Sequence, residues 1–173
     1  MLTIRPAERD DAAAIAQVHV DTWRSSYGGI IPKAYLDSMT VQNRTVVWLR
    51  LLERKDPGFT VLVSEDHDER IIGFVSACPL RHQDDRYQAE ISSLYVLRTH
   101  QRANHGRRLF MAASHRLAQS GLNGLFVWVL AESPYRRFYA KLGGEPVAEM
   151  VQNFAGVPLK EVGYGWQQTP TYD

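Results

Sequence analysis

Residues 89–130 run from a strand-like segment through an amphipathic helical segment to a second strand-like segment. The first is AEISSLYVL (89–97), the helical segment covers 106–119, and LFVWVLA (125–131) is a nearly continuous apolar run. Two strands joined by a crossover helix form a parallel pair. A continuous apolar run also suits a central strand that is buried on both faces. The chain is therefore expected to contain a parallel pair of strands at the centre of a sheet.

The remaining strand-like segments favour antiparallel pairing. FTVLVSE (59–65) and RIIGFVSAC (70–78) flank the polar turn DHDE, which is typical of a hairpin. Residues 145–166 predict two final strands around a turn, and LTIR (2–5) predicts the first strand. Helical patterns fill much of 10–52. We therefore expect an α/β fold with a mixed, mostly antiparallel central sheet that contains the parallel pair and is flanked by helices.

Length and composition predict one domain. The 173 residues are 45% hydrophobic, which fits a single domain over 1–173 with its core at about 2–166. The formal charge of +1 gives no global attraction to nucleic acid or to anionic lipid. Cys78 is the only cysteine, which fits a reducing compartment, and no apolar run is long enough to cross a bilayer. We expect a cytoplasmic protein that binds neither nucleic acid nor membrane.

The segment before the helix at 106–119 is strongly basic. A helix N-terminus carries about +0.5 of a charge, so cations there are unfavourable unless an anion occupies the site. A solvated basic turn, or pairing with acids distant in sequence, would explain the same pattern. An RNA-binding stripe is disfavoured because no interleaved aromatic residues accompany the charges. The basic residues of this segment are Arg98, His100, Arg102, His105, Arg107 and Arg108.

Three motifs in this order resemble the GNAT superfamily of N-acetyltransferases. The stretch 101–106, QRANHG, is similar to the family's acetyl-CoA motif Q/R-x-x-G-x-G/A, with Asn104 where the first glycine usually stands. Asparagine tolerates a left-handed backbone best after glycine, so the loop shape should survive. SPYRRFYAKLGG (133–144) predicts a short helix that Ser133 caps and Pro134 begins, and it resembles a second family segment with Ser133 in the usual asparagine position. DTWRSSYGGIIPKAYLDSM (21–39) is similar to the N-terminal helices of one branch.

The resemblance implies acetyl-CoA as the acyl donor and a direct transfer to an amine. The backbone N–H groups of 102–107 would hold the pyrophosphate, and the parallel strands would splay apart so that the pantetheine arm lies between them. The implied cofactor-binding residues are Leu94, Tyr95, Val96, Gln101, Arg102, Ala103, Asn104, His105, Gly106, Arg107, Ser133 and Tyr139.

Two residues are candidates for the proton transfers of this reaction. Tyr139 would give a proton to the leaving thiolate, because a phenol is protonated at neutral pH. Glu90 would accept the amine proton directly or through water. A backbone N–H near Tyr95 would stabilise the oxyanion. Spacing alone favours core packing beside Phe138 for Tyr139, and it is the resemblance that reverses this interpretation. A solvated charge at a strand edge would explain Glu90 nearly as well.

The acceptor would be a small-molecule, amino-acid or peptide amine, in a pocket formed by Trp23, Tyr27 and Trp128. Each of these aromatic residues has core packing as its alternative. The histidines lack metal-ligand spacing, so no metal is expected. Membership of the family also implies a possible homodimer. A non-catalytic acyl-CoA-binding or regulatory module on the same fold is the alternative to an enzyme.

Overall fold

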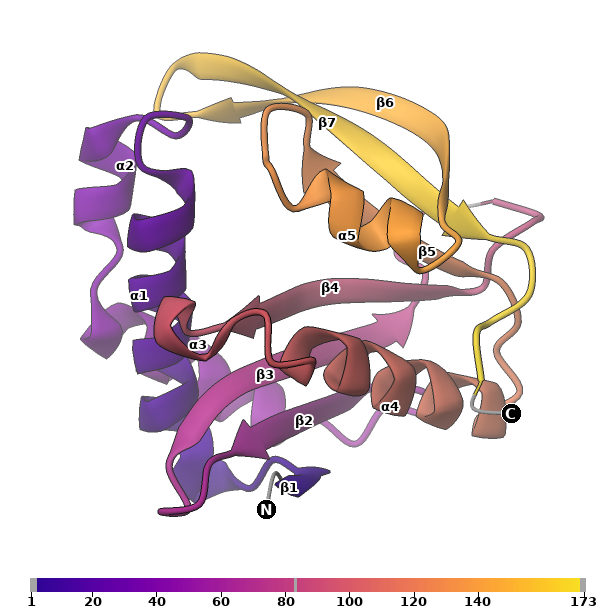
Figure 1. Ribbon diagram of the computed structural model, residues 1–173, viewed down its shortest axis with the longest axis horizontal. Helices are drawn as coiled ribbons and strands as arrows, with labels where there is room; N and C mark the ends of the chain where they lie inside the picture. Colours follow the sequence, from indigo (N-terminus) through magenta and orange to yellow (C-terminus); the bar gives the residue numbers. More distant parts are fainter. Residues whose placement is uncertain (1–2, 83, 172–173) are drawn as a thin grey trace.

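The strands of the protein form one seven-stranded sheet in the order β1-β2-β3-β4-β5-β7-β6 (Figure 1). The computed structural model describes residues 3–82 and 84–171. β4 and β5 are parallel, and the other neighbouring strands pair antiparallel. The strands are β1 (Thr3–Pro6), β2 (Thr60–Glu65), β3 (Ile71–Pro79), β4 (Ala89–Val96), β5 (Leu125–Leu130), β6 (Glu145–Phe154) and β7 (Val157–Trp166). This confirms the predicted mixed sheet; Leu2 of the predicted first strand lies outside the described residues.

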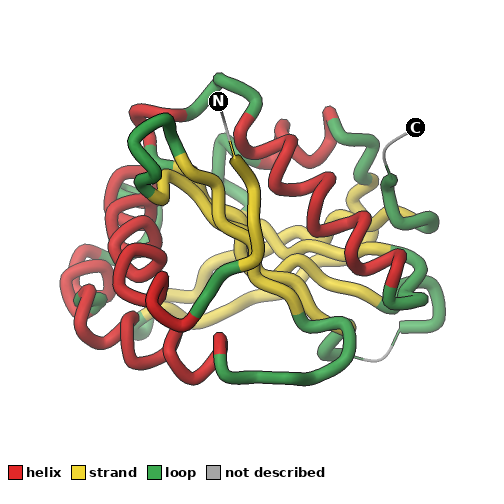
Figure 2. The backbone as a smooth tube through the Cα atoms, turned by 90° about the horizontal axis from the view of Figure 1, so that it is seen from below, coloured by secondary structure: helices red, strands yellow, loops and turns green. Residues whose placement is uncertain are grey.

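Helices cover both faces of this sheet (Figure 2). α1 packs on β3 and β4 together with α3, whereas α4 packs on β2, β3 and β4 from the other face. α5 contributes Phe138 and Tyr139 to the core cluster that includes α4. The helices are α1 (Ala12–Tyr27), α2 (Lys33–Ser38), α3 (Val41–Leu52), α4 (His105–Gln119) and α5 (Arg136–Lys141), with short 3-10 turns η1 (Arg9–Asp11) and η2 (Arg98–His100). In the described chain, we find no helix with the length and apolar character that a bilayer span requires.

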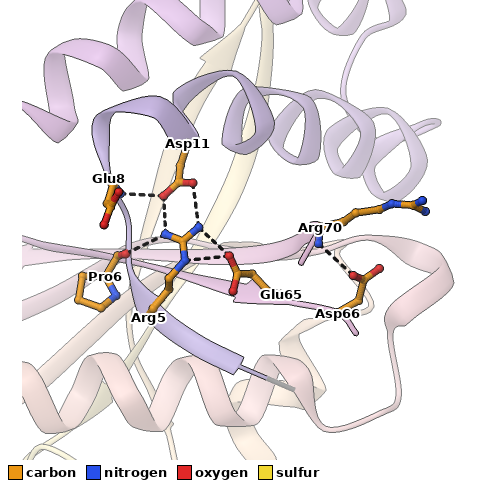
Figure 3. Close-up of polar contacts among 7 residues, drawn as sticks. All are labelled: Arg5, Pro6, Glu8, Asp11, Glu65, Asp66 and Arg70. Carbon is orange, nitrogen blue, oxygen red and sulfur yellow. Dashed lines mark hydrogen bonds and ion pairs between the residues drawn. The ribbon is translucent and has the colours of Figure 1, made fainter. Parts of the chain in front are cut away.

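An arginine holds the start of α1 against the sheet (Figure 3). Arg5 on β1 donates to both carboxylate oxygens of Asp11, at 2.6 and 2.9 Å, and its Nε donates to Glu65 on β2 at 2.8 Å. Asp11 also accepts the Glu8 backbone N–H at 2.7 Å. The Arg5 guanidinium lowers the pKa of Asp11. These contacts join the neighbouring strands β1 and β2 to the start of α1, the helix that carries Trp23 and Tyr27.

The turn before α5 differs from its prediction. The sequence places Ser133 as a helix cap with Pro134 as the first helical residue, but the helix begins only at Arg136. Ser133 is buried and its Oγ accepts the backbone N–H of Tyr135 at 3.2 Å. Its carbonyl accepts the N–H of Arg136 at 3.3 Å. Ser133 therefore stabilises a tight turn that leads into the helix, a local alternative that serine side chains readily form.

His19 is a buried polar residue at the centre of the α1–α3 packing. Its side chain is 8% exposed, and its Nδ1 accepts the indole N–H of Trp48 at 3.2 Å. Its ring stacks on Tyr95 with centroids 5.3 Å apart. Burial, and next the charge of Arg44, lower the pKa of His19 to about 4. The neutral imidazole is therefore the form that the folded protein accommodates.

Because His19 has a lower pKa in the folded protein than its ordinary value of 6.5, acidification favours the unfolded state. We expect the free energy of unfolding to fall by about 2 kcal/mol from pH 7 to pH 5 on account of this residue. The variant His19→Gln keeps an acceptor for Trp48, and its free energy of unfolding should fall by about 2 kcal/mol less over the same pH range. Urea titrations at both pH values measure this. His67→Gln, at an exposed histidine, should follow the wild type; an equal acid loss in His19→Gln would contradict the assignment.

Candidate active site

The parallel strands β4 and β5 pair over only two residues before they separate. Their register holds at Ala89–Leu125 and Glu90–Phe126, and no pairing continues from Ile91 onward in the described sheet. β4 has a bulge here, because Ser76 pairs with Ser93 and Ala77 with Ile91, which leaves Ser92 as the extra residue. A bulge bends its strand, whereas β5 stays paired with β7 over its length. The predicted splayed pair is confirmed.

A cavity of about 1070 Å³ opens where the two strands diverge. It brings together side chains from α1, β4, the loop before α4, β5, α5 and β7. Fourteen of the sixteen residues predicted for the site line it. The two exceptions are Ala103 and Ser133. The residues that line it are Trp23, Tyr27, Glu90, Leu94, Tyr95, Val96, Gln101, Arg102, Asn104, His105, Gly106, Arg107, Trp128 and Tyr139.

The loop before α4 has the backbone shape that the sequence predicted. Arg102 and Asn104 both adopt left-handed conformations, with φ of 64° and 66°. Asn104 therefore adopts the left-handed backbone that glycine would adopt at a lower cost in free energy. A Cβ at Gly106 would stand 3.5 Å from the Phe138 ring, which is ordinary contact, so the protein's own packing leaves room there. Successive N–H groups in such a loop form a concavity that suits an anion.

Two arginines of this loop have no acidic partner among the described residues. Arg102 and Arg107 are exposed, and within the residues that the structure describes neither forms an ion pair. His105 lies beside them with its Nδ1 buried and without a hydrogen-bond partner. Burial, and then the charge of His100, lower the pKa of His105. The pairing with distant acids that the sequence left open is therefore absent at these two arginines, and an anion would complete the loop.

A chain of hydrogen bonds connects this loop to α1 and β4. Gln101 donates from Nε2 to the Val96 carbonyl at 3.0 Å and accepts the Tyr135 hydroxyl on Oε1 at 3.2 Å. The same hydroxyl lies 3.2 Å from Ser26 Oγ on α1. Gln101 thus fixes the loop to the end of β4. Tyr135 links α1 to the loop before α4 beside the cavity.

Tyr139 belongs to the core and to the cavity at once. Its ring lies 5.1 Å from Phe138 and 6.2 Å from Tyr164, centroid to centroid, and only 8% of the residue is exposed. Burial, and next the charge of Tyr95, raise the pKa of Tyr139 well above its ordinary value. Burial likewise raises the pKa of Tyr95 to about 12. Both phenols therefore retain their protons at neutral pH and can donate hydrogen bonds into the cavity.

Glu90 is a buried carboxylate and not the solvated edge charge of the alternative interpretation. It is 2% exposed, and both its oxygens accept from Arg81, at 2.6 Å from Nη2 and 3.1 Å from Nε. Glu90 raises the pKa of the Arg81 guanidinium. The pair fixes the position of the carboxylate at the point where β4 leaves β5.

Aromatic residues gather at the other end of the cavity. Trp23 and Tyr27 on α1 have ring centroids 5.2 Å apart, and Tyr35 on α2 stacks on Trp23 at 6.1 Å. Trp128 on β5 is half-buried and lines the same cavity, but its ring contacts Phe126 at 4.9 Å and His82 at 6.2 Å, near the point where Phe126 pairs with Glu90. The predicted residues Trp23, Tyr27 and Trp128 therefore pack against other aromatic rings and also line the cavity, because the cavity borders the hydrophobic core.

Three chemically important residues of the cavity lining were not predicted from the sequence: Arg81, Tyr135 and Glu161. Arg81 pairs with Glu90 across the loop between β3 and β4, Tyr135 pairs with Gln101 far away in the chain, and no periodic pattern indicates either pairing. Glu161 carried a signal, since it interrupts the otherwise apolar face that Leu159 and Gly163 share on β7. A charge at an inward strand position is expensive unless it has a partner or a function.

The fold and this site define an acyltransferase architecture, and comparison with known proteins agrees. The acetyltransferase (GNAT) family model matches residues 14–144. "Uncharacterized N-acetyltransferase YuaI" of Bacillus subtilis is 39% identical over 166 residues, which cover 96% of this chain and 93% of that protein. The chain therefore belongs to the GNAT acetyltransferase family, and its class of activity is that of an N-acetyltransferase.

Solved structures show the same fold at low sequence identity. PaiA N-acetyltransferase from Thermoplasma acidophilum, in complex with coenzyme A, has a TM-score of 0.73 at 19% identity, covering 94% of this chain and 98% of that one. YncA, a putative acetyltransferase from Salmonella typhimurium with its cofactor acetyl-CoA, has a TM-score of 0.73 at 23% identity, covering 100% and 96%. Ribosomal-protein-alanine N-acetyltransferase from Brucella melitensis has a TM-score of 0.74 at 21% identity, covering 95% and 98%.

Proposed function

We propose that the protein transfers the acetyl group of acetyl-CoA to a primary amine of a small molecule or peptide, with both substrates bound at once. The observation that carries this proposal is the separation of β4 from β5 directly after Glu90, beside a basic loop in which Arg102 and Arg107 form no ion pair within the described residues. The separation leaves one strand edge without a partner, and the loop offers an anion site next to it. A donor such as acetyl-CoA fits both features, because the amides of its arm can pair with the open strand edge and its pyrophosphate can occupy the anion site.

The residues of the chain fit this donor. The N–H groups of the loop 102–107 would hold the pyrophosphate, with Arg102 and Arg107 supplying charge. The unpaired edge of β4 at Leu94–Val96 would pair with the amides of the pantetheine arm. Because the Val96 carbonyl already accepts from Gln101, the arm would meet a strand end that is fixed in place.

The donor supplies a thioester, and the side chains around it handle the protons. The amine nitrogen bonds to the acetyl carbon while the carbon–sulfur bond breaks, which yields an amide and free coenzyme A. The neutral amine loses one proton and the leaving thiolate gains one. Glu90 would accept the first through water, since Arg81 occupies both its oxygens, and Tyr139 would donate the second. A backbone N–H near Tyr95 would stabilise the oxyanion.

Replacement of Asn104 should separate the backbone role of this residue from its side chain. Asn104→Gly keeps the left-handed conformation and should bind coenzyme A within about threefold of the wild type. Asn104→Val strains that conformation by about 1–3 kcal/mol and should weaken binding by about tenfold or more. Calorimetric titration with coenzyme A measures both. Ala155→Val is the matched control, because Ala155 is also left-handed, with φ of 50°, but lies in the β6–β7 turn. Unchanged affinity in Asn104→Val would argue against the loop as the anion site.

Removal of the Tyr139 hydroxyl should slow the reaction without weakening donor binding. We expect Tyr139→Phe to lower kcat by about 10²- to 10⁴-fold, as a lost proton donor does, with the KM for acetyl-CoA nearly unchanged. Thiol release across a panel of amines gives both constants. Tyr164→Phe is the control, since its buried hydroxyl accepts from Arg136 and does not line the cavity. Binding of coenzyme A without turnover on any amine would instead favour the non-catalytic alternative.

A further inference from the structure

The cavity has two ends of opposite character. One end is the basic loop before α4, with Arg98, Arg102 and Arg107 among its lining residues. The other end lies where α1 and α2 meet the β6–β7 hairpin, which crosses the top of Figure 1. Here the lining is aromatic and carries one acid, Glu161 on β7. The phosphates of a donor fit the first end only, so the second end is left for the acceptor.

Glu161 points to the side of the sheet that α1 and α2 cover. Along β7, Val162 and Tyr164 belong to the core cluster on the α4 face, whereas Leu159 packs with the aromatic residues of α1 and α2. Alternation along a strand places Glu161 on the same face as Leu159. It pairs in register with Leu130 on β5. The carboxylate thus lies in the cavity wall, beside the splayed end of β5.

Glu161 has no cation to neutralise it. In the part of the chain that the structure describes, it forms neither a hydrogen bond nor an ion pair through its side chain. The neighbouring Lys160 binds Glu149 at 2.7 Å, and Arg81 is engaged by Glu90 at 2.6 Å. Burial raises the pKa of Glu161. Burial is also the main cause of the raised pKa of Tyr27 and of Tyr95, and the charge of Glu161 adds to both. A half-buried carboxylate in this position lacks a positively charged partner.

A further buried polar atom at this end has no partner among the described residues. Thr22 is 4% exposed, lines the cavity, and its Oγ1 makes no hydrogen bond there. The buried indole N–H of Trp23 faces the Tyr95 hydroxyl, whose pKa it lowers against the larger effect of burial. The faces of Trp23, Tyr27 and Tyr35 offer negative π-surface beside the acid. A cation that is held by a carboxylate and flanked by aromatic rings is a favourable arrangement.

We propose that Glu161 binds the ammonium group of the acceptor, and that the acceptor is a primary amine with an apolar or aromatic body and no acidic group beside the nitrogen. This inference rests on the function proposed above and names its substrate class. The aromatic rings receive the body of the amine, and Glu161 repels a carboxylate next to the nitrogen. Before attack, the bound ammonium loses one proton to solvent water in the open cavity, which leaves the neutral nucleophile of the reaction above.

Paired substrates test the proposal on one protein. With saturating acetyl-CoA, 2-phenylethylamine should give a kcat/KM at least about tenfold above that of L-phenylalanine, which differs by the carboxylate alone. Glu161→Gln should raise the KM for 2-phenylethylamine by about 10- to 100-fold with a smaller change in kcat, and should narrow the ratio between the two substrates. Because both rates come from the same sample, a partly unfolded variant does not change that ratio.

Controls separate this inference from the function on which it rests. Glu145→Gln, at an exposed acid on β6, should leave both substrates unaffected, and coenzyme A should raise the Tm of Glu161→Gln as much as that of the wild type. Tyr35→Leu should raise the KM for 2-phenylethylamine with Glu161 intact. Turnover of amines with an unchanged KM and ratio in Glu161→Gln, or a preference for L-phenylalanine, would overturn the role of Glu161 alone. No turnover with any amine would overturn the proposed function as well.

Discussion

The separation of β4 from β5 is the feature on which the rest of the site depends. A parallel pair at the centre of a sheet ordinarily stays hydrogen-bonded, because an unpaired buried backbone group is costly. Here the extra residue Ser92 bends β4, while β5 remains bound to β7. The bend lies directly after Glu90, so the last paired residue of β4 is also the buried acid of the cavity. The fold thus creates an open strand edge and positions a carboxylate at its base.

Electrostatics then divides the opening into two parts. The basic loop before α4 sets its charge against a helix N-terminus, an arrangement that loses stability in the absence of an anion. At the opposite end, the Glu161 carboxylate lies beside aromatic rings of α1 and α2, and it forms no ion pair within the described residues. Binding of the two charged substrates should therefore stabilise the folded protein, because the basic end gains an anion and the acidic end gains a cation.

Much of the fold and part of the site were predictable from local pattern. The strand–helix–strand unit at 89–130 predicts the parallel pair, and the hairpins around it predict the antiparallel remainder, because these features depend on short-range periodicity. Asn104 was correctly expected to adopt a left-handed conformation. Ser133 was wrong as a helix cap, because its hydroxyl bonds a turn residue instead and α5 begins at Arg136. Tyr135 and Glu161 were missed because their neighbours are distant in the chain, and Arg81 was missed because its pairing with Glu90 depends on the shape of the loop between β3 and β4.

The sequence by itself determined the order of the elements, the charge of the loop before α4 and the presence of a phenol in the helix after β5. These properties follow from residue type and from spacing within a few turns. Only the tertiary structure decided that Glu90 is held by Arg81, that Arg102 and Arg107 form no ion pair within the described residues, and that Glu161 shares a cavity with Trp23. Partnership and burial depend on how the strands register and where the sheet opens, and residues far apart in the chain meet only after that geometry is set.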